Sequence, residues 1–293
     1  MFIDIHAHAY RKPFLQLDGH APWPTPDQLI EFYDELGVEK AALLPLIGPE
    51  YYLPQANEDI LEAAERFPGR FIPYCNIHPQ AVCNEINAPL SEVFKKYKDA
   101  GCRGVGEVIC NMSFHDPFMI NFFGEVEKAE LPLTFHLAHR IRGCYGIYDE
   151  PGLPGLDETL SRFPGINFCG HSMAFWAEIS QLEKPYDRAG YPIGKVTEGV
   201  LPKMLRKHPN LYGDMSAGSG CNAFTRDEEF AVKFINEFQD RLLFGIDICS
   251  APSMQAHGTL AHFLQKLLHE GKITRAVFDK LARTNAERLL KLN

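Results

Sequence analysis

The strongest constraint on the fold is an alternation of strand and helix patterns that runs along the whole chain. Eight short runs of β-branched and other apolar residues are each followed by a stretch with helical spacing of apolar side chains. The eight runs are residues 2–8, 41–46, 71–79, 102–108, 131–136, 166–171, 211–216 and 242–248. Strands that alternate with helices favour a parallel sheet, because each helix returns the chain to the edge where the next strand begins.

The clearest helix pattern begins beside Thr25. Thr25 is a typical N-cap, Pro26 stands at the first helical position, and Gln28 completes a capping box. The apolar residues that follow have the spacing of one helix face, and they are Leu29, Phe32, Tyr33 and Leu36. At the other end of the chain, residues 273–292 also have a helical pattern, in which Asn285 is a candidate cap.

The connections between these elements differ in length. Those from a helix to the next strand are short, as at 37–40, 68–70, 164–165 and 208–210. Those from a strand to the next helix are longer and richer in polar and aromatic residues, as at 48–57, 109–118, 140–156 and 174–195. Eight such units predict one α/β domain over residues 1–293, a single (β/α)8 TIM barrel with a C-terminal helical extension and its site at the C-terminal ends of the strands. A doubly wound open sheet is the alternative, which the lack of a Gly-x-Gly-x-x-Gly after the first strand disfavours.

Composition and charge restrict the partners. The formal net charge of −9 argues against general binding to nucleic acid or to an anionic membrane, since both require a basic face. No run is apolar enough to cross a bilayer, and Met1 leads into the first strand without a secretion-type leader. The eight cysteines form no Cys-x-x-Cys pair, so a thiolate zinc site is not expected. We therefore expect a reduced, cytoplasmic protein that acts on a small-molecule substrate, with the oligomeric state, homo-oligomers included, left open.

Residues that can bind metals stand on the first strand. Side chains alternate between the two faces of a strand, so Asp4, His6 and His8 are expected on one face. Two imidazoles two residues apart can bind one cation, and imidazole suits zinc and other divalent transition metals. An isolated His-x-His is more often a pair of ordinary polar residues at a strand end, so the interpretation depends on the rest of the chain.

Further polar residues stand where other predicted strands end. His78, His136 and His171 end the third, fifth and sixth strands, Glu107 ends the fourth, and Asp247 ends the eighth. In a barrel these strand ends form one rim, so we expect the five side chains to converge with the histidine pair of the first strand. Each has a structural alternative when taken alone, such as pairing of the glutamate with a nearby arginine. The joint pattern is more specific than any single member.

This pattern resembles the amidohydrolase superfamily, and most closely its amidohydrolase-related (amidohydrolase 2) branch of metal-dependent hydrolases and non-oxidative decarboxylases. The resemblance covers the chain from end to end and rests on the motifs Asp4-Ile5-His6-Ala7-His8, Phe135-His136, Gly170-His171-Ser172, Gly245-Ile246-Asp247 and Asn285-Ala286-Glu287-Arg288-Leu289-Leu290. It implies a divalent metal, usually zinc, bound by residues that match the family ligands, namely His6, His8, His136 and Asp247. It also implies that His171 lies beside the metal, where it assists catalysis or binds a second ion.

The fourth strand departs from the family pattern. It has no lysine of the kind that some members carbamylate to bridge two metals, and it has Glu107 in a Gly-Glu-Val setting. This glutamate looks like a metal ligand of the related TatD-type nucleases. The resemblance therefore implies Glu107 as a further ligand and leaves one or two metal ions open.

The implied ligands suggest a role for each group. Zinc with an open coordination position can lower the pKa of bound water to about 7. Asp247 is then placed to take the proton of this water and pass it to the leaving group. His171 could polarise the substrate carbonyl or stabilise the oxyanion.

Several residues near the predicted rim are expected to line the substrate pocket. The candidates are His78, Arg140, Trp176 and Asp214, with the loop aromatics Tyr10, Tyr51, Tyr52 and Phe175. Arg140 could hold a carboxylate or phosphate together with Arg142. Asp4 is a candidate outer acceptor for an imidazole N–H. The structural alternatives are a solvated loop charge for either arginine, loop packing for the aromatics, and a buried hydrogen-bonding group for Asp4 or Asp214.

The sequence favours a metal-dependent hydrolase that attacks a C–N or C–O bond of a small carboxylated or cyclic substrate. Non-oxidative decarboxylation of an aromatic or unsaturated acid is the alternative, because it would use the same ligands. A metal-binding scaffold without turnover, and a phosphoesterase suggested by Glu107, are the remaining hypotheses. The loops of a barrel decide among such chemistries, and the sequence does not name the substrate.

Overall fold

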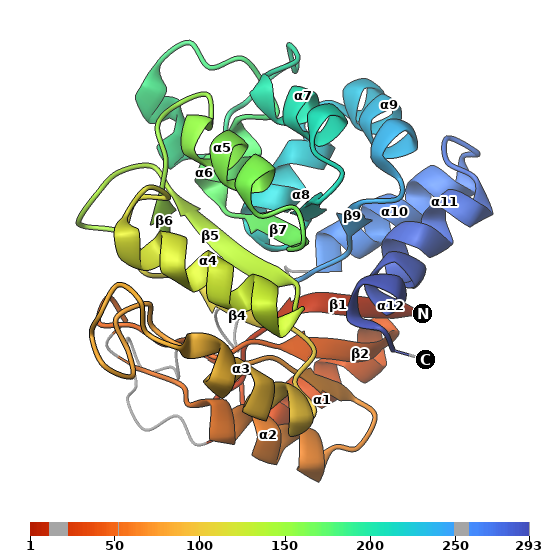
Figure 1. The fold of residues 1–293 in the computed structure, drawn as a ribbon. Helices are drawn as coiled ribbons and strands as arrows, with labels where there is room; N and C mark the ends of the chain where they lie inside the picture. Colours follow the sequence, from red (N-terminus) through yellow and green to blue (C-terminus); the bar gives the residue numbers. More distant parts are fainter. Residues whose placement is uncertain (12–22, 52, 249–257, 293) are drawn as a thin grey trace.

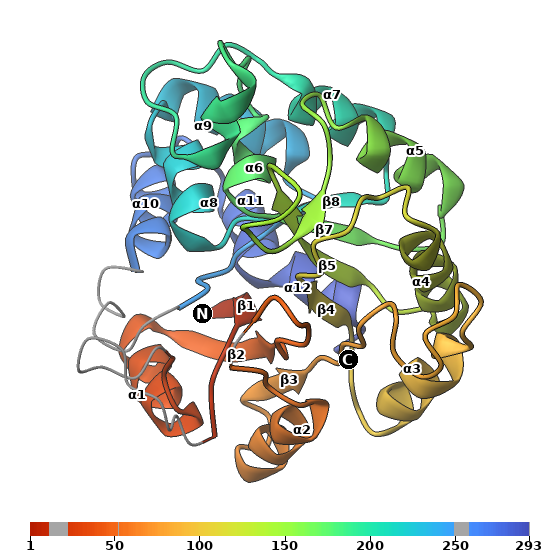
Figure 2. The same ribbon diagram turned by 90° about the vertical axis from the view of Figure 1, so that its left-hand side faces the viewer.

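The computed structural model describes residues 1–11, 23–51, 53–248 and 258–292 and shows a ring of parallel strands surrounded by helices (Figure 1, Figure 2). All eight predicted strands are present, as β1 (Phe2–Ala7), β2 (Val38–Leu43), β3 (Phe71–Pro73), β4 (Val105–Val108), β5 (Leu133–Ala138), β7 (Phe168–His171), β8 (Leu211–Asp214) and β9 (Leu242–Leu243). The predicted α/β barrel is confirmed. A two-residue strand within the expected 140–156 loop, β6 (Ile147–Tyr148), pairs with β5 outside the ring.

Two seams close the ring. Strands β1, β2 and β3 form one hydrogen-bonded sheet, and β4, β5, β7, β8 and β9 form the other. At one seam the backbone of Cys75 bonds to Gly104 and Gly106, with N···O distances of 3.0 and 2.9 Å. At the other seam the N–H of Asp247 donates to the carbonyl of His6 at 2.9 Å. The first and last strands of the chain are therefore neighbours in the barrel.

Helices cover the outside of the ring (Figure 2). Their bounds are α1 (Pro26–Leu36), α2 (Asn57–Arg66), α3 (Leu90–Asp99), α4 (Pro117–Ala129), α5 (Pro154–Arg162), α6 (Met173–Ala177), α7 (Val200–Lys207), α8 (Ala217–Thr225), α9 (Glu228–Phe238), α10 (Thr259–His269), α11 (Arg275–Asp279) and α12 (Asn285–Leu290), with a 3-10 turn at Pro185–Ala189 and a π-helical turn at Lys280–Thr284. The predicted start of α1 is confirmed, because the side chains of Thr25 and Gln28 each accept the other's backbone N–H. Gly37 ends this helix with φ of 79°, a left-handed conformation that favours glycine.

A small apolar cluster fills one end of the barrel. The inward side chains of β1, β2, β3, β7 and β9 meet α12 there, and the cluster consists of Ile3, Ile5, Ala42, Leu44, Ile72, Tyr74, Cys169, Leu243, Ala286, Leu289 and Leu290. This is the end at which both termini lie, next to α12 (Figure 1). Apolar packing thus closes the N-terminal end, which leaves the C-terminal ends of the strands for polar groups.

Asn285 is not the cap that the sequence suggested. Its side-chain amide donates to the carbonyls of Gln239 and Leu242, at 2.7 and 2.9 Å, and the residue is fully buried. Asn285 therefore attaches the start of α12 to the start of β9. A hydrogen-bonding side chain at a helix start can serve tertiary packing as well as capping, and the sequence pattern does not separate the two.

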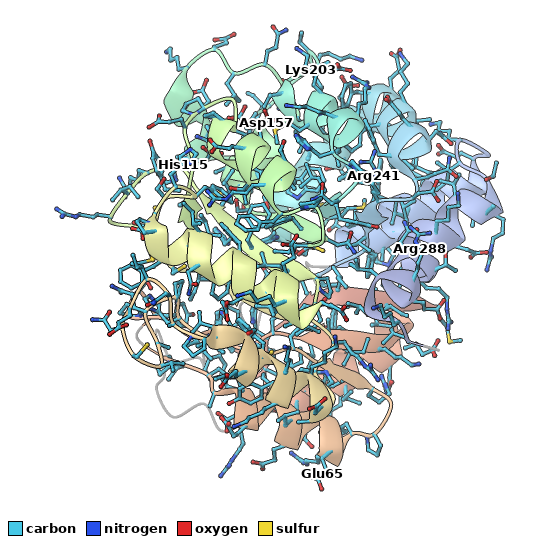
Figure 3. The ribbon with its side chains drawn as sticks, in the orientation of Figure 1. Glu65, His115, Asp157, Lys203, Arg241 and Arg288 are labelled. Atoms are coloured by element: carbon cyan, nitrogen blue, oxygen red, sulfur yellow. The ribbon has the colours of Figure 1, made fainter. Side chains whose placement is uncertain are left out.

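Charged side chains lie on the outer faces of the helices, as Glu65, Asp157 and Lys203 illustrate (Figure 3). Some of them join neighbouring helices: Asp157 of α5 bonds to Lys207 and His208 at the end of α7. Among the described helices, none is both long and apolar enough to span a membrane.

Candidate metal centre

An irregularity in β1 brings His6 and His8 to the inside of the barrel. The pairing of β1 with β2 shifts register between Asp4 and Ala7. Ile3 and Ile5 belong to the inner cluster, whereas the Asp4 side chain turns to α1 and accepts a hydrogen bond from Tyr33. A bulge of this kind reverses the alternation of side chains beyond it. The prediction that Asp4 shares a face with the two histidines was therefore wrong, because strict alternation does not hold through the bulge.

Two imidazoles and two carboxylates converge above the apolar cluster. The Nε2 atoms of His6 and His8 are 3.1 Å apart. Glu107 Oε2, from β4, lies 3.5 Å from the first of these nitrogens and 3.4 Å from the second. Asp247 Oδ1, just beyond β9, lies 4.0 and 3.7 Å from the same two atoms. All four residues are buried, so each donor atom faces the others rather than solvent.

These spacings fit the ligands of one divalent cation. Four nitrogen and oxygen donors at 2.0–2.2 Å from a tetrahedral zinc ion would be about 3.3–3.6 Å apart. The four donors here are 3.1–4.0 Å apart in the pairs given above. Two overlapping sets of three residues have donor atoms within 4.8 Å of one another, namely His6, His8 and Asp247, and His6, Glu107 and His171. The residues present therefore fit a metal ion, with the fourth-strand glutamate in the donor set.

The electrostatics of the cluster also call for positive charge. Burial would raise the pKa of Glu107, but His6, His136 and His8 hold it well below its usual value. Burial acts in the same direction on Asp247, whose pKa His6 and His171 lower. Burial would lower the pKa of His6, yet Asp214, Asp247 and Glu107 raise it well above its usual value. The two buried carboxylates, Glu107 and Asp247, therefore stabilise positive charge between them. That charge can be a proton on His6 or a bound cation.

Outer hydrogen bonds fix the orientation of both first-strand imidazoles. Asp214 Oδ2, at the end of β8, lies 2.6 Å from His6 Nδ1. The carbonyl of Leu44 lies 2.9 Å from His8 Nδ1. With Nδ1 as the donor in both rings, both Nε2 atoms present lone pairs to the centre. Asp4 was the candidate outer acceptor for an imidazole N–H, but Asp214 occupies that position. Asp4 accepts the backbone N–H groups of His6 and Ile246 instead.

His136 and His171 lie on the other side of Glu107. His136 Nδ1 is 2.9 Å from Glu107 Oε1, and His171 Nε2 is 4.0 Å from the same oxygen. His171 Nε2 also lies 3.4 Å from Asp247 Oδ2, while its Nδ1 is 2.9 Å from the hydroxyl oxygen of Ser216. Burial lowers the pKa of His136 despite Glu107, which favours the neutral imidazole. His136 thus belongs to the cluster and is hydrogen-bonded to Glu107. It is not a member of either of the two sets of three possible metal ligands given above.

Ser216 was missed by the sequence analysis. It lies two residues beyond Asp214, and its N–H donates to Asp214 Oδ1 at 3.0 Å. The only signal available was its place at the end of the seventh predicted strand, which a serine shares with many structural positions. Its contact with His171 depends on tertiary structure.

A cavity of about 30 Å³ opens above the cluster, enough for one or two water molecules. Its lining consists of His8, Trp23, Leu46, Tyr51, Glu107, Ile109, His136, Tyr145 and Asp247. Ring contacts run around it from β1 to β5: His8 with Trp23, Trp23 with Tyr51, Tyr51 with Tyr145, and Tyr145 with His136, with centroids 4.7–6.4 Å apart. We call these five rings the aromatic belt.

The other predicted pocket residues do not line this cavity. Trp176 is in α6 and is buried against Phe175 and Phe224, with its indole N–H donating to the carbonyl of Asp214. Arg140 is exposed and donates to Gly143 within its own loop. His78 is partly buried and accepts the N–H of Gln80, and burial lowers its pKa. None of these side chains, nor Asp214, is in the described lining, and Tyr52 lies outside the described residues.

No family model matches the chain, and no curated protein sequence matches it. Solved structures do. An uncharacterised TIM-barrel protein from Bordetella bronchiseptica has a TM-score of 0.67 and 17% identity, over 99% of this chain and 98% of that one. A probable 2-pyrone-4,6-dicarboxylic acid hydrolase from Acinetobacter baumannii, with citric acid bound, has a TM-score of 0.59 and 14% identity, over 99% of both chains.

A third structure is 5-carboxyvanillate decarboxylase from Novosphingobium aromaticivorans, in complex with manganese and 4-hydroxy-3-methoxy-5-nitrobenzoic acid. It has a TM-score of 0.51 and 16% identity, over 90% of this chain and 79% of that one. At these identities the comparison concerns the fold. The chain therefore shares the barrel fold of these solved structures, and it has a buried His/Glu/Asp cluster at the C-terminal ends of its strands.

Proposed function

We propose that this protein is a metal-dependent enzyme that hydrolyses a C–N or C–O bond of a small carboxylated or cyclic substrate. The observation that carries the proposal is the convergence of His6, His8, Glu107 and Asp247 on one ion-sized space. A divalent cation held there would act as a Lewis acid and make hydroxide available at neutral pH.

Asp247 has the geometry of a general base. One of its oxygens faces the first-strand histidines, at 3.7 Å from His8 Nε2, and the other lies 3.4 Å from His171 Nε2. The carboxylate is ionised at neutral pH, because the imidazoles around it hold its pKa low. Asp247 therefore accepts a proton from the attacking water and passes it to the leaving group, while His171 binds the oxygen on which negative charge develops.

Decarboxylation of an aromatic or unsaturated acid is the alternative, and the cavity lining favours it specifically. Its described residues include a belt of aromatic rings but no lysine or arginine. A substrate carboxylate would then find its positive partner at the base of the cavity, where the cation would bind, and the rings of the belt would have to move apart to take a flat substrate ring. In this reaction Asp247 or His171 would protonate the carbon that loses carbon dioxide.

One experiment separates the two chemistries. The metal-loaded protein is incubated in ¹⁸O-labelled water with a panel of lactones, amides and aromatic carboxylic acids, and the products are analysed by mass spectrometry. Hydrolysis incorporates ¹⁸O into the product without release of carbon dioxide. Decarboxylation releases carbon dioxide and leaves a product without ¹⁸O. A protein that binds metal but turns over no member of a broad panel would instead be a scaffold.

Phosphate esters belong in the same panel. Glu107 is the feature that suggests a phosphoesterase, and hydrolysis of p-nitrophenyl phosphate esters would support that reading. Activity on lactones without activity on these esters would exclude it.

We further propose zinc as the native metal, with one ion bound by His6, His8, Glu107 and Asp247. The two oxygens of Glu107 face different imidazole pairs, because Oε2 lies near His6 and His8 while Oε1 lies near His136 and His171. A second ion would therefore use Oε1. Elemental analysis of the purified protein decides between zinc and manganese and between one and two ions per chain.

The described cysteines are free thiols. This supports the proposal of a reducing compartment such as the cytoplasm. Thiol titration of the freshly purified protein under denaturing conditions is expected to find them all reactive.

A further inference from the structure

A second, larger cavity lies beside the barrel, between the segment that joins α6 to α7 and the end of α8. Its volume is about 930 Å³, within the range of small-molecule sites. The segment is held in place by backbone pairing of Ser180 with Glu198 and by a hydrogen bond from Gln181 N–H to the carbonyl of Thr197 at 2.8 Å. The cavity shares none of its described lining residues with the candidate metal centre.

Arg226, at the end of α8, is partly buried and lines this cavity. Its Nε and Nη2 atoms are buried, and neither has a hydrogen-bond acceptor among the described residues. The carboxylate next to it in sequence, Asp227, is already used: its oxygens accept the N–H groups of Val196 and Phe230, and Lys195 Nζ lies 3.6 Å away. Glu183 and Asp187 line the same cavity but form no described ion pair with Arg226.

Arg188 is a second arginine whose Nη2 is buried without a hydrogen-bond partner among the described residues, but its charge is balanced by a carboxylate. It is fully buried, yet its Nε lies 3.0 Å from Glu178 Oε1, and its Nη1 donates to the carbonyl of Asp149. Arg226 has no such arrangement within the part of the chain that the structure describes. Two buried N–H donors without an acceptor are costly, and a bound ion is one of the explanations for such donors.

We propose that the cavity is a binding site for a small oxyanion, a carboxylate or a phosphate, which pairs with Arg226. The planar guanidinium presents two parallel N–H donors that match either group. Because Nε and Nη2 are buried, two-point binding requires the guanidinium to turn toward the cavity about its terminal torsions. The Lys195 ammonium also lines the cavity; it is mostly exposed and lies 3.6 Å from Asp227 and 3.9 Å from Glu229.

The test compares the protein with Arg226→Met, which keeps the length of the side chain and removes its charge. Thermal unfolding and isothermal titration calorimetry are carried out with inorganic phosphate and, separately, with acetate. We expect the wild-type protein to bind at least one of the two anions and the variant to bind it at least tenfold more weakly. In buffer without either anion the variant should unfold at the same temperature as the wild type or higher, because two buried donors without acceptors have been removed.

Two controls localise the effect. Arg206→Met removes an exposed arginine that already pairs with Glu198 and Glu237, and it should leave anion binding unchanged. His6→Ala disables the candidate metal centre and should also leave it unchanged, so the two proposals can fail separately. Binding of phosphate alone or acetate alone supports the site and identifies the anion. Equal binding by wild type and Arg226→Met, binding of neither anion, or a lower unfolding temperature of Arg226→Met in anion-free buffer overturns it.

Discussion

Asp214 is the residue that links the two layers of the candidate metal centre. One oxygen lies 2.6 Å from His6 Nδ1, and the other accepts the N–H of Ser216, whose hydroxyl contacts His171. A single carboxylate thereby orients one proposed metal ligand and supports the position of a second imidazole. Its backbone carbonyl also accepts the indole N–H of Trp176, which holds this strand end against α6.

Asp214→Asn should weaken metal binding without unfolding the protein. Loss of a carboxylate behind a metal-binding imidazole typically costs 10–100-fold in metal affinity. Competition with a chromophoric chelator measures the affinity. Asp149→Asn is the matched control, because Asp149 is also buried and accepts several backbone N–H groups. Those groups belong to Glu150, Gly155 and Leu156, which are not part of the metal-binding cluster. Equal metal affinity of wild type and Asp214→Asn would show that Asp214 does not orient His6.

His6→Ala should reduce metal affinity by more than about a hundredfold, because loss of a ligand exceeds the 10–100-fold cost of losing an outer partner. Elemental analysis after dialysis measures the bound metal. His115→Ala, an exposed histidine on the outer surface (Figure 3), is the control and should retain full metal content. Full metal content and turnover in both His6→Ala and Asp247→Asn would mean that the centre is assigned to the wrong residues.

The positions of some site residues could be predicted from the sequence, and those of others could not. The strand ends that carry His6, His8, Glu107, His171 and Asp247 could be predicted to converge, because every parallel strand of a barrel ends on the same rim. The face of Asp4 could not, because one bulge in β1 reverses the alternation on which the prediction rested. The partner of each imidazole, such as Asp214 for His6, depends on distances between strands that are far apart in sequence.

At the scale of elements, the loops after the strands were harder to predict than the strands. The 140–156 stretch contains β6, whose two residues are too short to give a pattern of their own. Trp176 was expected at the pocket because it follows a strand, but α6 begins at once and turns the indole into the core. An aromatic residue after a barrel strand can line the pocket or pack into the core, and the geometry of the following turn determines which of the two it does.

A buried ion pair helps to join two of these loops. Arg188 lies between Glu178, after α6, and the backbone of Asp149, after β6. Arg188→Ala should lower the free energy of unfolding by about 3–5 kcal/mol, because it leaves a buried carboxylate without its partner. Urea denaturation followed by circular dichroism measures the change. Arg206→Ala, which breaks exposed ion pairs on α7, should cost no more than about 1 kcal/mol, so similar losses in the two variants would contradict this role for Arg188.

At the scale of the whole molecule, the two ends of the barrel have different tasks. The inner apolar cluster and α12 stabilise the N-terminal end, while the polar cluster occupies the C-terminal end. The sequence predicted this division, because long polar loops followed the strands and short turns preceded them. It did not predict that α12 itself would fill the ring, since a C-terminal amphipathic helix can pack in many places.

Leu290→Ala should therefore separate stability from metal binding. Leu290 is fully buried in the inner cluster, so truncation should cost about 2–5 kcal/mol of unfolding free energy and leave metal affinity unchanged. Ile193→Ala, at an exposed side chain, should cost less than about 0.5 kcal/mol. Denaturant titration and chelator competition give the two quantities, and a parallel loss of both in Leu290→Ala would show that the two ends are not independent.

The seam between β1 and β9 has a consequence for how the protein is made. His6 and His8 are synthesised long before Asp247, because nearly the whole ring of strands lies between them in the sequence. A nascent chain can thus present imidazoles to a metal long before it can surround one. For the proposed metal centre, a translation product that ends before the last strand should therefore be unable to retain the ion.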